Sequence, residues 1–189
     1  MLNNGVDYDH WHLEKSIKNC PEDIRHIVSQ NKIIIGYHGA LAQWIDYDLL
    51  NRIADDDRFI LLLIGYEHDG NLKKSGVLDK KNVYFIGPRP YQELSKYAIF
   101  YDVAILPFMI NNITLSVSPV KIFEYMAGDK PVVTYALPEC KKYVSCLCAD
   151  TQDEFMAQLE KALTLRNDDK YIQQLREDAL NNTWIAITR

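Results

Sequence analysis

The segment 118–128, with the sequence SPVKIFEYMAG, carries the residues of this chain that are best suited to chemistry. Ser118 is a good N-cap, Pro119 suits the first helical position and Gly128 suits a helix stop, so the segment predicts a helix with these ends. The free N–H groups and the positive dipole at such a helix start can bind a phosphate, and Lys121 adds a full charge in the first turn. Glu124 follows three residues later on the same face.

A carboxylate one turn inside a phosphate-binding helix can accept hydrogen bonds from the two hydroxyls of a ribose. Lys121 and Glu124 would then grip a nucleoside diphosphate together. The alternative is that these two residues form a surface pair at i,i+3 spacing, which contributes only about a few tenths of a kcal/mol. Spacing alone leaves both interpretations open.

The elements that must position this helix alternate regularly along the chain. Six short β-rich runs are separated by longer helix-like segments, and most of the runs are continuously apolar. Continuous apolar strands are typical of a parallel sheet that helices cover on both faces. The six predicted strands span residues 32–37, 59–64, 82–86, 102–106, 131–135 and 145–149.

Helix start signals stand between and after these strands. Asp46 and Pro90 each precede a helix-like segment, and Thr151 with Glu154 forms a capping box before the segment 152–164. A further helix is predicted over 168–180. The alternation predicts an α/β fold, a Rossmann-like, doubly wound, parallel six-stranded sheet in the order 3-2-1-4-5-6.

In such a sheet the ligand crevice lies between strands one and four, at their carboxyl ends. The loops 36–44 and 107–117 should therefore face one crevice. The first loop contains His38 and Gly39, and the second leads to the helix at 118–128.

Composition limits the function classes. A chain of 189 residues suits one domain, and 21 basic against 26 acidic residues give a net charge of −5, which argues against nucleic acid as a partner. No apolar run reaches the roughly 18 residues of a membrane span, and the N-terminus does not resemble a signal peptide. Four cysteines are too few for a disulfide framework and match no common zinc spacing, so we expect a cytoplasmic protein with no metal site.

The stretch 118–133 (SPVKIFEYMAGDKPVV) resembles the signature of the donor-binding domain of GT-B glycosyltransferases, in particular the large retaining group 1, or family 4, type. Further similar motifs follow the expected order: GYHGAL at 36–41, LLLIG at 61–65, NVYFIGPRPYQEL at 82–94 and DVAILPF at 102–108. NGVD at 4–7 resembles the linker that leaves the acceptor domain, and NTW at 182–184 resembles the segment that turns back toward it. The resemblance implies an interdomain linker remnant over 1–20 and a nucleotide-sugar-binding domain over 21–189, with the N-terminal acceptor domain absent.

The resemblance also implies roles for single residues. Glu124 matches the family's ribose-binding glutamate, while Ser116 stands where the family has a second glutamate that contacts the sugar. Lys121 would stabilise the leaving diphosphate as the catalytic residue, next to Ser118 at the helix start. The family's Arg and Lys after strand one are replaced by Ala40 and Ile45.

Three residues outside the helix complete the predicted substrate-binding set. Gly39 and His38 follow strand one, where the histidine could reach a phosphate or the sugar, or could simply be solvated. Arg89 follows strand three, where the family's base-contacting loop begins. It could supply a cation for the diphosphate or could have a structural role.

The function implied by the resemblance is transfer of a sugar from a UDP- or GDP-sugar to an acceptor, with no obligatory metal or cofactor, in cell-surface polysaccharide or glycoconjugate synthesis. The isolated chain should bind nucleotide and transfer nothing, and the full-length enzyme could touch the inner membrane face through the acceptor domain. Alternatives are a non-catalytic nucleotide-sugar-binding module, which the missing glutamate at Ser116 suggests, and a GT-B type sugar-nucleotide epimerase. A phospho-acceptor signalling domain would need an Asp where Gly87 and Pro88 stand.

Overall fold

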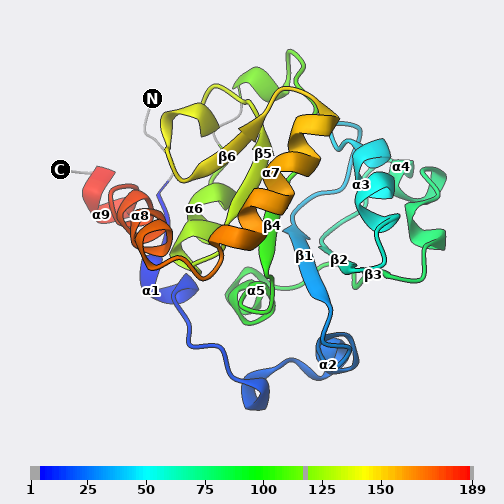
Figure 1. Cartoon of the computed structure of the whole chain (residues 1–189), viewed down its shortest axis with the longest axis horizontal. Coiled ribbons are helices and arrows are strands. Elements are labelled where there is room, and N and C mark those ends of the chain that lie inside the picture. Colours follow the sequence, from blue (N-terminus) through cyan, green and yellow to red (C-terminus); the bar gives the residue numbers. More distant parts are fainter. Residues whose placement is uncertain (1–4, 117–118, 188–189) are drawn as a thin grey trace.

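Figure 1 shows the computed structural model of the chain, in which residues 5–116 and 119–187 are described. Six parallel strands form one sheet in the order β3-β2-β1-β4-β5-β6, which confirms the predicted topology. The strands are β1 Ile33–His38, β2 Phe59–Ile64, β3 Val83–Phe85, β4 Val103–Leu106, β5 Val132–Tyr135 and β6 Cys146–Ala149. Each lies within one residue of the bounds that its apolar run predicts.

Helices cover both faces of the sheet, as the doubly wound fold requires. The helices α3 (Tyr47–Ala54) and α7 (Gln152–Leu165) pack on one face, and α5 (Tyr91–Ala98) and α6 (Lys121–Ala127) pack on the other (Figure 1). Every residue of β2 and β4 is buried. This double cover explains why the strand sequences are continuously apolar instead of alternating.

Two of the predicted helix starts are capped by their side chains: Asp46 and Thr151 accept hydrogen bonds from backbone N–H groups of α3 and α7. Asp168 caps α8 (Asp169–Leu180) in the same way, at the start of the helix predicted over 168–180. The capping box differs in one detail, because the Glu154 carboxylate accepts from the N–H of Asp150, at 2.7 Å, and not from that of Thr151. Short polar side chains at these positions stabilise the first turn, and this local effect can be recognised from the sequence.

The helix α6 begins later than predicted. It spans Lys121–Ala127 with Val120 as N-cap and no side-chain capping bond, although Gly128 ends it as expected. The N–H of Ile122 bonds to the carbonyl of Pro119 at 3.2 Å, so the first turn is closed by an i,i+3 bond before the α-helical pattern starts. Ser118, the predicted N-cap, lies outside the described residues.

The start of the N-terminal segment, with α1 (Tyr8–Trp11), lies beside the C-terminal helices, and the chain then runs along the bottom of the view to α2 (Glu22–Val28) (Figure 1). This continuation also contains η1 (Ile17–Asn19), and the C-terminal end contains α9 (Trp184–Ile187). Val6 and Trp11 belong to the hydrophobic core, and the Val6 N–H donates to the Asn182 carbonyl at 2.9 Å. The segments around residues 6 and 182, which resemble the linker from the acceptor domain and the return toward it, are therefore neighbours. The domain boundary at residue 20 stays a prediction.

The remaining elements are short connections. They are α4 Asn71–Lys74, η2 Val77–Asp79, η3 Thr114–Ser116 and η4 Cys140–Lys142. Of these, η3 lies in the long connection between β4 and α6, at the edge of the sheet where the crevice is expected. The side chain of Ser116 is not described.

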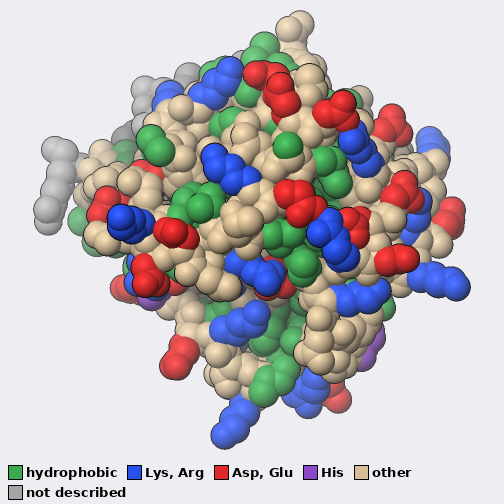
Figure 2. Space-filling view, in the orientation of Figure 1, with side chains coloured by type: hydrophobic (Ala, Val, Ile, Leu, Met, Phe, Trp, Pro, Cys, Tyr) green, Lys and Arg blue, Asp and Glu red, His purple; other side chains and the backbone are tan. Residues whose placement is uncertain are grey.

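Basic and acidic side chains are interspersed over the face shown in Figure 2. Within the described ranges, no helix is long and apolar enough to cross a membrane, and no group of three or more His, Cys, Asp or Glu side chains could hold a metal ion. All four cysteines are free thiols: Cys20, Cys140 and Cys146 are buried and Cys148 is half-buried.

Candidate functional site

A cavity of about 280 Å³ opens between the loops that follow β1 and β4. This is the position that the reversal of strand order predicts for a ligand. Its lining comes from the β1 loop, from the connection after β4 and from the first residue of α6. The lining residues are Tyr37, Ala40, Trp44, Phe108, Ile113, Thr114 and Lys121.

Lys121 lies across the β1 loop, directly over Gly39. A Cβ atom at Gly39 would stand 2.3 Å from the Cε of Lys121 and 2.9 Å from the hydroxyl of Tyr37, and the φ of Gly39 is +142°. The positive φ and the close approach of the lysine together favour glycine at this position. The N–H of Gly39 is itself bonded to the Ile64 carbonyl, at 2.8 Å, so this residue provides space and not a donor.

The ammonium group of Lys121 is the positive charge of the crevice. Among the residues that the structure describes, no hydrogen bond or ion pair to this group is found. The charge is therefore available to an anionic ligand at the mouth of the cavity.

Glu124 and His38 form a buried pair beneath the crevice. Their side chains are bonded at 2.9 Å between the Nε2 of His38 and the Oε2 of Glu124, and the residues are 1% and 6% exposed. The surface-pair interpretation of Lys121 and Glu124 is therefore wrong, because the carboxylate turns into the protein. The Nε2 of His38 is engaged in this bond, so the histidine holds Glu124 in place, and its contact with a phosphate or sugar stays a prediction.

Burial also determines the protonation of this histidine. It lowers the pKa of His38, and the hydrogen bond and charge of Glu124 only partly oppose the shift. A neutral imidazole that bonds a carboxylate carries its proton on Nε2, which leaves Nδ1 as an acceptor. Nδ1 is buried and has no partner among the described residues.

Aromatic side chains cover the pair. Trp11 of α1 stacks on the His38 ring with centroids 5.1 Å apart and planes at 15°, and its Nε1 donates to the Tyr91 hydroxyl at 3.1 Å. Burial raises the pKa of Tyr91, and the nearby charge of Glu124 raises it further. Sequence reasoning missed both aromatic residues, although Tyr91 lies inside the motif at 82–94.

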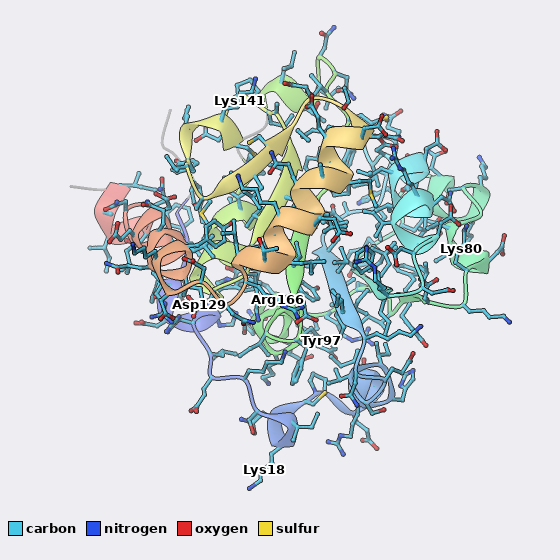
Figure 3. All side chains as sticks on the ribbon, viewed as in Figure 1. Lys18, Lys80, Tyr97, Asp129, Lys141 and Arg166 are labelled. Carbon is cyan, nitrogen blue, oxygen red and sulfur yellow. The ribbon has the colours of Figure 1, made fainter. Side chains whose placement is uncertain are left out.

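Arg89 does not face the crevice. Its guanidinium donates to the hydroxyl of Tyr97 at 3.1 Å (labelled in Figure 3), to the carbonyls of Ile86 and Pro88, and to Asp23 of α2 at 2.6 Å. The bond to Asp23 raises the pKa of Arg89. Most of its donors are thus engaged in tying the loop after β3 to α2, which is the structural alternative and not the predicted diphosphate contact.

The structure therefore brings together four of the predicted site residues and separates one. Gly39 and Lys121 meet at the crevice, and His38 and Glu124 meet directly below it. Arg89 belongs to another network. The Ser116 side chain and Ser118 lie outside the described part of the structure.

Comparison with known proteins agrees with this architecture. TuaH of Bacillus subtilis (strain 168), a protein named for glycosyltransferase activity in teichuronic acid biosynthesis, is 27% identical over 195 residues, covering 100% of this chain and 48% of TuaH. The crystal structure of Anabaena Alr3699/HepE in complex with UDP and glucose superimposes with a TM-score of 0.72 at 16% identity, over 95% of this chain and 51% of that one. A glycosyltransferase from Rickettsia africae ESF-5 gives 0.74 at 13% identity, over 98% and 53%.

The chain spans about half the length of these relatives. At such low identity the two solved structures show the fold alone, which is the Rossmann-like half of a GT-B protein. The family model described as Glycosyl transferases group 1 matches residues 32–165, from the start of β1 to the end of α7. Because this match covers well over half of the sequence, the chain belongs to the glycosyl transferases group 1 family.

Proposed function

We propose that this chain is the donor-binding domain of a glycosyltransferase that moves a sugar from a nucleoside diphosphate sugar to an acceptor. The observation that carries the proposal is the ammonium of Lys121, which lies over Gly39 and has no partner within residues 5–116 and 119–187, with the buried carboxylate of Glu124 one helical turn away. Family membership and the complex of Anabaena HepE with UDP and glucose support it.

Lys121 acts on the leaving group in this proposal. When the bond between the sugar and the diphosphate breaks, negative charge develops on the diphosphate, and a preorganised cation stabilises that charge. Ser118 and Gly39 belong to the same diphosphate site, one at the approach to α6 and the other as the gap beneath the lysine. No metal is required for this step.

Glu124 binds the ribose. Its Oε2 is bonded to His38, and we assign the ribose hydroxyls to Oε1, near the Tyr91 hydroxyl. His38 is a positioning residue in this proposal, because it acts through the carboxylate. The Trp11 ring stacks on the imidazole and holds the His38 ring in this orientation.

The remaining parts of the proposal concern the whole protein. The donor is a UDP- or GDP-sugar, and the acceptor site lies on an N-terminal domain of the same enzyme. Its product belongs to cell-surface polysaccharide or glycoconjugate synthesis on the cytoplasmic side, with membrane contact through that domain. The epimerase alternative is not favoured by the family, and the non-catalytic module retains one argument, Ser116 in place of a glutamate.

Calorimetric titration of the chain with UDP, GDP and ADP tests the proposal. We expect one of the three to bind, and we expect Lys121→Met and Glu124→Gln each to weaken that binding about 10- to 100-fold, since each removes a charge-assisted contact. Lys161→Met, at an exposed lysine of α7, should bind like the parent. Binding of none of the nucleotides, or unchanged binding by both site variants, would contradict the proposal.

A further inference from the structure

The cavity beside Lys121 has an apolar, largely aromatic lining. Tyr37 lies near the end of β1, Ala40 and Trp44 lie in the loop that follows it, and Phe108 and Ile113 come from the connection after β4. The rings of Tyr37 and Phe108 meet edge to face, with centroids 6.3 Å apart. A volume of about 280 Å³ is at the lower limit of small-molecule sites, which suits one sugar ring and not a whole nucleotide sugar.

The two hydroxyls of this lining donate to backbone carbonyls. The Tyr37 hydroxyl donates to the Ala40 carbonyl at 2.8 Å. The Thr114 hydroxyl donates to the Met109 carbonyl at 2.5 Å and accepts from the Asn111 N–H at 2.9 Å. Each hydroxyl has thus given its proton to a carbonyl and can only accept from a ligand, and most of the remaining described lining is aliphatic and aromatic carbon beside the Lys121 ammonium.

These carbon walls disfavour a sugar that turns a hydroxyl toward them and favour one that turns a methyl group toward them. A hydroxyl that leaves water without gaining a hydrogen bond loses free energy, whereas a methyl group gains free energy against aromatic carbon.

We propose that this cavity selects a donor sugar that carries a methyl group, in an acetamido or a 6-deoxy sugar, over the corresponding unsubstituted hexose. The inference rests on the proposed function, because a diphosphate at Lys121 brings the attached sugar to this cavity. Apolar pockets discriminate by about 10- to 200-fold for one buried carbon group. The methyl-bearing donor should therefore bind at least about 10-fold more tightly than the unsubstituted donor.

The test uses calorimetry on the unmodified chain, with donors that share the nucleoside diphosphate that binds. The parent hexose donor is compared with its 2-acetamido and its 6-deoxy derivative. We expect at least one derivative to bind about 10-fold or more tightly than the parent donor, and the two arms show which methyl group the cavity takes. If the parent hexose donor binds as tightly as both derivatives, the inference is overturned.

A pair of variants assigns the preference to the cavity. Ile113 lines it and is 57% exposed, so Ile113→Asn should reduce the preference several-fold without unfolding the chain and without changing affinity for the bare nucleoside diphosphate. Val144, 86% exposed before β6, is the matched control, and Val144→Asn should keep the preference. An unchanged preference in Ile113→Asn overturns the inference.

The failures of the two proposals are distinguishable. If no nucleoside diphosphate binds, the proposed function fails and the sugar inference fails with it. If a nucleoside diphosphate binds and the parent hexose is preferred, only the sugar inference fails.

Discussion

At the scale of single residues, the buried pair of His38 and Glu124 should make the free energy of unfolding depend on pH. Burial lowers the pKa of His38 in the folded chain, so the unfolded chain takes up a proton first as the pH falls below about 6.5. The contribution of His38 to stability is therefore complete above about pH 6.5 and is lost as the pH falls through its folded pKa. His38→Gln cannot titrate and should lose less stability than the parent between about pH 7.5 and about pH 5.5.

Urea unfolding followed by tryptophan fluorescence at the two pH values measures this difference. His68→Gln, at an exposed histidine, is the control and should keep the parent's dependence on pH. A parent-like dependence in His38→Gln as well would show that His38 does not titrate differently in the folded and unfolded chains.

At the scale of elements, Asp46 joins a helix, a strand and a second helix. Its Oδ1 caps α3 by accepting from the Leu49 N–H at 2.9 Å, and its Oδ2 accepts from Tyr135 of β5 at 2.6 Å and from Gln152 of α7 at 3.0 Å. Asp46→Ala removes the cap and both links, so we expect a loss of about 2–5 kcal/mol in the free energy of unfolding. Asp168 caps α8 at an exposed position, and Asp168→Ala should cost about 0.5–2 kcal/mol. Equal losses in urea unfolding would mean that the links from Asp46 to β5 and α7 contribute nothing.

At the scale of the whole molecule, the N-terminal segment contacts the C-terminal segment and packs into the hydrophobic core. Trp11 is only 2% exposed and belongs to the same hydrophobic core as the strands, although η1 and α2 separate it from β1 in the sequence. We expect Trp11→Ala to lower the free energy of unfolding by about 3–5 kcal/mol, because a large core side chain is lost. Trp184 on α9 is 52% exposed, so Trp184→Ala should lower the free energy of unfolding by less. Urea unfolding measures both losses. If Trp11→Ala loses no more free energy of unfolding than Trp184→Ala, then α1 does not unfold cooperatively with the rest of the domain.

Much of the fold follows from the sequence alone, because its signals are local. Continuous apolar runs separated by helices are compatible with few arrangements, and right-handed crossovers reduce them to the doubly wound order that is observed. The caps at Asp46, Thr151 and Asp168 act within one turn. The meeting of the β1 loop with the start of α6 follows from the same topology, since both lie at the carboxyl edge of neighbouring strands.

The partners of the site residues were decided only by the tertiary structure. His38 bonds to Glu124 across 86 residues, Trp11 bonds to Tyr91 across 80, and Arg89 bonds to Asp23 across 66. No local signal specifies such pairs, because each depends on how a helix rotates and packs against the sheet. The same packing turned Glu124 inward and Arg89 away from the crevice, whereas residue type and spacing were equally compatible with the opposite orientations.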